Sequence, residues 1–274
     1  MPFNDRDQTI LTDLSKAQSI FPDLGELLAF YERVFHLQFS WKDRLIREGK
    51  AKYWGKREIR LQALESGSPQ VRFEELGLET GSFLRLFQEI LGVLIPYTGS
   101  DPALGTESSA SEIQGYAREI FAGQGPLVVS GASDDIIKTA GGLALAPYLF
   151  LACEGILPRI PPNSWYREFC PVCGGKPCFA ALTSDTDPRT LLCPRCHGEW
   201  TYGRIGCPFC KDRESQTYYP SEDGRYRLYA CEVCHRYLKT VDARERSMDL
   251  CLPVECLVTV SMDIAAQEKG FKSY

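Results

Sequence analysis

The sequence lacks several features that would place it in a common functional class. Its first eight residues are polar and acidic, without the basic stretch and apolar core of a secretory signal. The longest apolar run, 140–153, has 14 residues, which is too short to cross a bilayer and suits a buried helix. No block of five or six basic residues occurs. These absences predict a cytoplasmic protein that neither inserts into membranes nor binds nucleic acid through a basic patch.

Composition predicts an ordinary folded protein with an acidic first half. The chain has 274 residues, of which 44% are apolar and 24% charged, enough for one large domain or two smaller ones. Residues 1–164 carry 16 Lys and Arg against 21 Asp and Glu, a net charge of −5, whereas residues 165–274 carry 15 of each. Neither a nucleophile–base pair nor a phosphate-binding loop is evident. We therefore expect a protein that is not an enzyme.

The first part of the chain has helical periodicity and the second part has short β-type segments. Apolar spacing and terminal signals predict helices over 9–20, 23–49, 82–94, 112–122 and 133–155. Three prolines in residues 157–164 predict a linker. Strands are expected over 177–182, 190–192, 200–205, 217–219, 226–230 and 236–241, with a hairpin turn at 221–224. A last helix is expected over 255–269, ended by Gly270 and packed on the N-terminal half.

Cysteine spacing carries the chemical information. Eight of the twelve cysteines form four Cys-x-x-Cys knuckles: Cys170/Cys173, Cys193/Cys196, Cys207/Cys210 and Cys231/Cys234. Two intervening residues allow both sulfurs of a knuckle to face one ion. Without a signal for an oxidising compartment, metal binding is favoured over disulfides. A bare dithiol-exchange protein would explain one knuckle and leave three unexplained.

An internal repeat predicts which knuckles share an ion. The step from Cys170 to Cys207 is 37 residues and the step from Cys193 to Cys231 is 38, and the knuckles within each unit are separated by 19 or 20 residues. This spacing is typical of zinc ribbons. We assign Cys170, Cys173, Cys193 and Cys196 to one ion and Cys207, Cys210, Cys231 and Cys234 to the other. Nested or crossed pairings remain alternatives, and four thiolates suit zinc or iron equally well.

The histidines, basic residues and remaining cysteines around the knuckles are expected to have structural or charge-compensating roles. His197 and His235 follow ligand cysteines and are expected to be surface residues of the turns, since each set already has four thiolates. The basic side chains within or just after knuckles are expected to compensate the negative charge of the sites: Arg195, Arg204, Lys211 and Arg236. The remaining cysteines are expected in the core: Cys153, Cys178, Cys251 and Cys256.

The cysteine-rich half resembles the FdhE family of formate dehydrogenase accessory proteins. The resemblance lies in 169–177 (FCPVCGGKP), 192–200 (LCPRCHGEW), 204–210 (RIGCPFC), 231–239 (CEVCHRYLK) and the final 263–271 (DIAAQEKGF). It implies a cytoplasmic maturation factor with rubredoxin-like metal sites that binds the catalytic subunit of formate dehydrogenase.

Together these interpretations predict an α+β protein. An all-helical domain with its linker (1–164) is followed by two tandem rubredoxin-like or zinc-ribbon units (165–206 and 207–246) and a C-terminal helix (247–274), with two metal ions, iron or zinc. The leading functional hypothesis is an assembly factor for formate dehydrogenase. Its competitors are a redox-active iron protein in maturation and, ranked lowest because the chain is acidic, a zinc-ribbon nucleic-acid-binding protein. The oligomeric state is left undecided.

Overall fold

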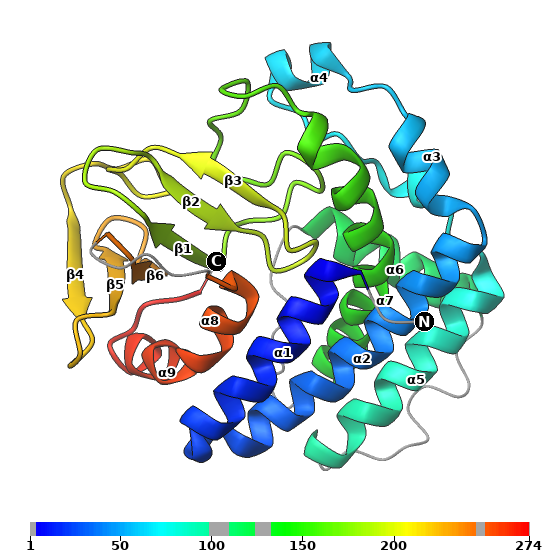
Figure 1. Cartoon of the computed structure of the whole chain (residues 1–274), viewed down its shortest axis with the longest axis horizontal. Coiled ribbons are helices and arrows are strands. Elements are labelled where there is room, and N and C mark those ends of the chain that lie inside the picture. Colours follow the sequence, from blue (N-terminus) through cyan, green and yellow to red (C-terminus); the bar gives the residue numbers. More distant parts are fainter. Residues whose placement is uncertain (1–3, 99–109, 124–132, 245–249, 274) are drawn as a thin grey trace.

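A computed structural model describes residues 4–98, 110–123, 133–244 and 250–273. Helices form one side of the molecule and a twisted sheet the other (Figure 1). The helical side contains α1 (Asp5–Ile20), α2 (Gly25–Arg47), α3 (Lys50–Lys56), α4 (Leu61–Ser66), α5 (Thr80–Thr98), α6 (Ala110–Gly123) and α7 (Ser133–Ile156). The five predicted helices are confirmed within a few residues. The short helices α3 and α4 were not predicted, because a helix of six or seven residues shows little periodicity.

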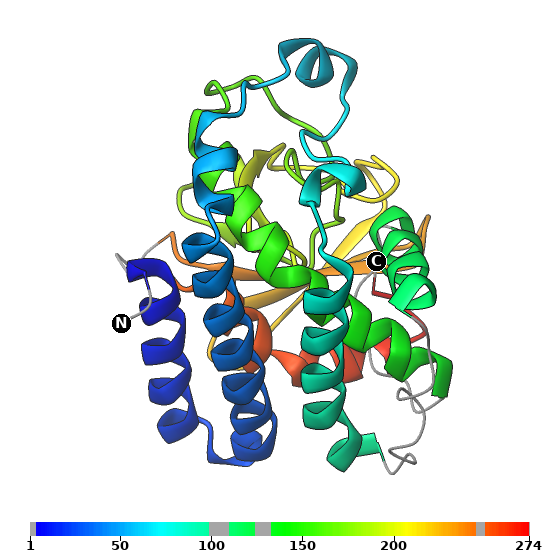
Figure 2. The ribbon, with the colours of Figure 1, turned by 90° about the vertical axis from the view of Figure 1, so that its right-hand side faces the viewer.

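Helix α7 forms the centre of the helical side. It contacts α2, α3, α5 and α6, while α1, α2 and α5 lie side by side (Figure 2). The stretch Ile136–Arg159 is long and apolar enough to span a membrane by length and composition, but 83% of its apolar window is buried inside the protein. Its apolar side chains thus pack against the neighbouring helices, as expected for the run 140–153.

The strands of both cysteine units form one six-stranded sheet. The strands are β1 (Phe179–Leu182), β2 (Arg189–Leu192), β3 (Glu199–Tyr202), β4 (Gln216–Pro220), β5 (Tyr226–Cys231) and β6 (Arg236–Asp242), ordered β3-β2-β1-β6-β5-β4. Only the central pair is parallel, with Phe179 opposite Lys239. Each unit therefore contributes an antiparallel set of three strands, which matches the internal repeat. The predicted hairpin turn between β4 and β5 is confirmed by the hydrogen bond from Gly224 N to Ser221 O.

The end of the chain differs from its prediction. A break at Thr259 separates α8 (Leu252–Val258) from α9 (Val260–Glu268), whereas one helix over 255–269 was expected. The Thr259 hydroxyl donates to Glu255 O, within the turn where the backbone leaves the helical conformation. Gly270 ends α9 with a φ of 83°. Helix α8 contacts α1 and β1, so the C-terminal segment does pack on the N-terminal half.

The core is continuous between the helices and the first cysteine unit. The largest buried cluster joins residues of α2, α5 and α7 to the first four knuckle cysteines, Leu191 and Trp200. A second cluster fills the space between α1, α2, the opposite face of the sheet and α8. The division into 1–164, 165–206, 207–246 and 247–274 stays a proposal, and its boundary at 246/247 lies outside the described residues.

Candidate metal centres

The first cysteine group lies in the main core with its four sulfurs close together. Sγ atoms are separated by 3.5 Å between Cys170 and Cys196, 3.4 Å between Cys173 and Cys193, and 3.6 Å between Cys173 and Cys196. A tetrahedron with metal–sulfur bonds of about 2.3 Å has sulfur–sulfur edges of about 3.8 Å. The group thus nearly matches the size of a tetrathiolate site, and it could bind one ion.

The second group has the same internal dimensions in a more open position. Sγ atoms are 3.6 Å apart between Cys207 and Cys234, and 3.5 Å apart between Cys210 and Cys231. The Phe209 backbone N–H donates to the Cys207 sulfur, as expected for a thiolate ligand in a turn. Cys210 is exposed, whereas all four cysteines of the first group are buried. The structure therefore brings the eight cysteines together in the two sets derived from the repeat. Their role as metal ligands stays a prediction.

All four knuckles use one backbone turn. The residue after the second cysteine donates its N–H to the carbonyl of the first cysteine, as His197 does to Cys193 and His235 to Cys231. That residue has a left-handed φ in every case: 75° at Gly174, 53° at His197 and His235, and 68° at Lys211. Glycine adopts this conformation without strain, and the other three residues do so at a cost. Three non-glycine residues thus adopt this unfavourable φ, which indicates that the geometry of the knuckle requires it.

Helix α7 closes the first group from the helical side. A Cβ atom built on Gly198 would lie 2.9 Å from the Cys153 sulfur and 3.2 Å from the Cys196 sulfur, so a side chain at this position would collide with both. Gly175 has the same constraint, because its Cβ would lie 2.9 Å from Cys193 Sγ. Cys153 is fully buried as expected, but its position beside the first group was not predicted.

One cysteine of the first group, Cys173, has surroundings that favour its thiolate form. Hydrogen bonds from the three neighbouring thiols, aided by the charge of Arg195 and opposed by burial, hold the pKa of Cys173 well below its ordinary value. Burial raises the pKa of Cys170 and of Cys196. A bound cation would add the stabilisation that the remaining thiolates need in this buried position.

The two histidines have different surroundings. His197 is only 9% exposed, and its ring packs on Phe150 with centroids 4.4 Å apart and on Phe35 at 5.7 Å. The expectation of a surface residue was wrong for His197, because α2 and α7 cover this knuckle. Burial lowers the pKa of His197 to about 3. His235 is exposed, as expected.

The basic side chains near the knuckles have different contacts in the two groups. Arg195 is buried, donates to Phe121 O and lies against Gly175, close to Cys193. Lys211 forms an ion pair with Glu168 at 3.2 Å. Arg236 lies over the Phe209 ring. Of these side chains, Arg195 is the one placed to act on the charge of a cysteine group, through its effect on Cys173.

The other cysteines lie outside both groups. Cys178, Cys251 and Cys256 are partly buried and pack against the second core cluster. The sulfurs of Cys178 and Cys256 are 3.7 Å apart, and Lys239 donates to the Cys256 carbonyl. Their placement agrees with the expected core role.

Comparisons with known proteins point to one family. The chain is 28% identical over 216 residues to the protein FdhE homolog of Aquifex aeolicus, covering 76% of this chain and 73% of that protein. It is 28% identical over 140 residues to the protein FdhE homolog of Pectobacterium atrosepticum, of which it spans 45%. The crystal structure of the FdhE protein from Pseudomonas aeruginosa superposes with a TM-score of 0.61 at 20% identity, covering 98% and 92% of the two chains. No family model matches.

Proposed function

We infer that the chain belongs to the FdhE family, and from this membership we propose that it is an accessory factor in the maturation of formate dehydrogenase. In this role it binds the catalytic subunit through the two-metal cysteine module and assists assembly of the active enzyme. It acts in the cytoplasm, before export or membrane assembly of its partner, and catalyses no reaction itself. Two ions, iron or zinc, hold the module.

The exposure of the second cysteine unit carries the proposal of partner binding. Apolar side chains usually buried are exposed here: Val233, inside the last knuckle, is 58% exposed, and Ile205, at the junction of the units, is 65% exposed. Apolar side chains held on a rigid element are suited to a protein interface. The first unit is instead covered by α7 and joined to the core, so it is suited to hold the second unit in place.

Co-purification with the catalytic subunit of formate dehydrogenase tests this proposal. We expect the metal-loaded chain to retain the subunit and Val233→Asp to lose it while keeping its metal content. Ile20→Asp is the matched control, because Ile20 is also exposed but lies at the end of α1. Equal retention by wild type and Val233→Asp would contradict binding through the second unit.

A gene deletion tests the maturation role independently of the binding surface. We expect the deletion strain to lose formate dehydrogenase activity while its transcript level is unchanged. Normal activity in that strain would contradict the proposal.

A redox role is the second candidate, and the exposure of Cys210 favours it. Electron transfer to a partner requires a metal centre near the surface, and the second group satisfies this requirement. Protein isolated from iron-replete cells would then be red, with a thiolate-to-iron absorption band that bleaches on reduction. Colourless protein loaded with zinc would remove this candidate and leave the assembly role standing.

A further inference from the structure

A small cavity lies where the two cysteine units meet on the sheet. It has a volume of about 240 Å³, and its lining includes the polar side chains of Arg189, Arg204, Arg213, Gln216 and Thr240. Lys239 reaches the α8–α9 segment from β6, so the next residue, Thr240, points to the opposite face of the sheet. The cavity is therefore on the face away from α8 and α9. Among the described residues, its lining includes no Asp or Glu.

Two of the three arginines that line the cavity, Arg189 and Arg213, have no carboxylate partner among the described residues. Arg189 is 2% exposed, and its guanidinium donates only to the carbonyls of Gly203 and Gly206 in the described part of the chain. Arg213 also has no ion-pair partner in the same part of the chain, but it is exposed, so Arg189 is the buried charge of the cavity. A buried guanidinium without a counter-charge is unfavourable. An anion in the cavity would compensate it.

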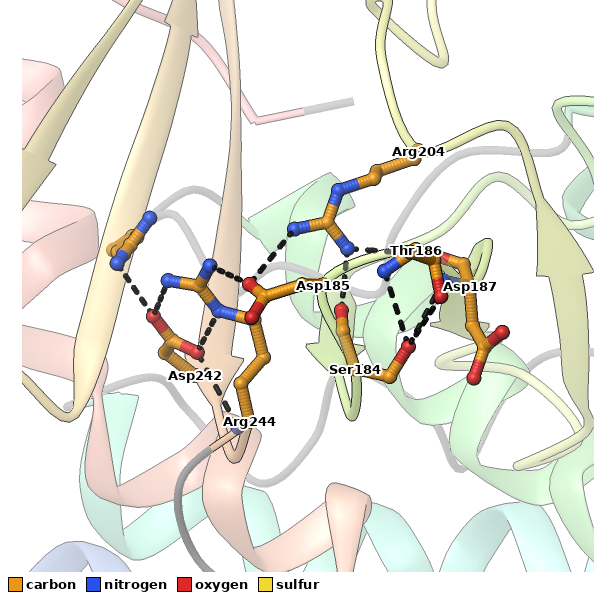
Figure 3. Close-up of polar contacts among 8 residues, drawn as sticks. Ser184, Asp185, Thr186, Asp187, Arg204, Asp242 and Arg244 are labelled. Atoms are coloured by element: carbon orange, nitrogen blue, oxygen red, sulfur yellow. Dashed lines mark hydrogen bonds and ion pairs between the residues drawn. The ribbon is translucent and has the colours of Figure 1, made fainter.

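The third arginine is held in place by the turn between β1 and β2. Figure 3 shows the Arg204 guanidinium directed at the turn, where it donates to the carbonyls of Ser184 and Asp187. Asp185 lies 3.9 Å away and is bound more closely by Arg244. The closest acceptors of Arg204 are therefore neutral carbonyls, and its nearest carboxylate is shared with Arg244.

Thr240 gives an independent sign that the cavity takes a ligand. It is 0% exposed, yet its Oγ1 has no hydrogen-bond partner in the described residues. A buried hydroxyl without a partner is uncommon, because its desolvation is not compensated. An acceptor in the cavity would satisfy it.

The negative charge of the second cysteine group offers a competing explanation for part of this arrangement. Gly206, the acceptor of Arg189, directly precedes Cys207, so a metal-bound thiolate there would attract the buried guanidinium. That attraction supplies no acceptor for Thr240, whose buried hydroxyl still lacks a partner. The cysteine group therefore accounts for the position of Arg189 but not for the cavity as a whole.

We propose that this cavity binds a small oxyanion, the phosphate or carboxylate group of a small molecule, between Arg189, Arg204, Arg213 and Thr240. Arginine matches both groups because its planar donors can hold two oxygens at once. The volume is below the 300–1,000 Å³ or so of cavities for drug-sized ligands, which favours a small anion.

Calorimetric titration of the metal-loaded full chain at constant ionic strength tests the proposal. The probes are inorganic phosphate and pyrophosphate on one side, and acetate and citrate on the other. We expect saturable binding of at least one of these pairs. Preference for the first pair identifies a phosphate group and preference for the second a carboxylate.

Two variants locate the site. We expect Arg213→Gln to weaken binding by about tenfold or more, because it removes a charged donor, and Thr240→Val to weaken it by a smaller factor. Arg47→Gln, an exposed arginine of α2, is the matched control and should bind as wild type does. All variants should keep two ions per chain. Absence of binding to wild type, or unchanged binding by Arg213→Gln, would overturn the proposal.

Discussion

The two cysteine groups share a spacing, a backbone turn and a set of sulfur–sulfur distances, but they differ at the positions next to the knuckles. The residue two places after Cys196 is Gly198, and the equivalent residue after Cys234 is Arg236. Likewise the residue two places after Cys173 is Gly175, and the equivalent residue after Cys210 is Asp212. Glycine is needed in the first group because a Cβ atom would lie 2.9 Å from Cys153 of α7 at position 198 and 2.9 Å from Arg195 at position 175. A larger side chain is tolerated in the second group, which is more exposed. The same turn thus serves a core position and a surface position.

Ions bound at the two groups would therefore have different mechanical roles. The first would tie the sheet to the helices, because its ligands belong to the main core cluster. The second would hold only its own three strands, since its unit joins the rest of the sheet through β1 and β6.

Loss of a ligand from each group should have the most unequal consequences. Cys170→Ser should remove one ion and unfold most of the chain, because a structural zinc site contributes about 10–16 kcal/mol, comparable to the whole stability of a domain. Cys210→Ser should remove one ion and leave the helical circular-dichroism signal and its melting largely unchanged. Metal analysis and thermal circular dichroism measure both effects. Two ions in either variant would refute the ligand assignment, and equal loss of helix in both would refute the difference in roles.

Chelation should separate the two ions in time. A strong chelator should take the ion of the second group first, because Cys210 is exposed and the first group is buried. We expect two kinetic phases of equal amplitude in a metal-release assay, with the helical signal retained after the first. In Cys210→Ser the fast phase should be absent. A single phase that releases both ions together would contradict the comparison.

A matched pair of substitutions tests the neighbouring positions directly. Gly198→Ala should destabilise the protein by about 1–3 kcal/mol, because the added methyl group would overlap the sulfurs of Cys153 and Cys196. Arg236→Ala, at the equivalent position of the second unit, should change stability by less than about 0.5 kcal/mol. Denaturant unfolding of the metal-loaded variants measures both. If Gly198→Ala unfolds as wild type does, α7 does not press on the first group as the structure describes.

Much of this architecture could be predicted from local patterns. The knuckle spacing and the repeat predicted which cysteines gather, because both are fixed by a short length of chain. Apolar periodicity predicted the long helices for the same reason. The pairing of β1 with β6, by contrast, joins strands about 60 residues apart, and nothing in the spacing indicates it.

The missed features depend on contacts between distant segments. His197 and His235 occupy the same place in the repeat, and their sequences do not reveal that α2 and α7 cover only one of them. The approach of Cys153 to the first group has the same origin. The one local sign was the glycine after His197, since a repeat that changes from arginine to glycine marks a position where space is limited.

Substitution of His197 and of His235 tests a smaller difference between the two cysteine groups. His197→Asn should destabilise the protein by about 0.5–3 kcal/mol, because it removes a buried ring that packs on Phe35 and Phe150. His235→Asn should have almost no effect, since that ring is exposed. Asparagine is the appropriate replacement at both positions because it tolerates the left-handed φ of 53°, so backbone strain is matched. Equal melting temperatures for the two metal-loaded variants would mean that the covering of the first knuckle by α2 and α7 contributes nothing to stability, and the distinction between a core centre and a surface centre would then rest on the cysteines alone.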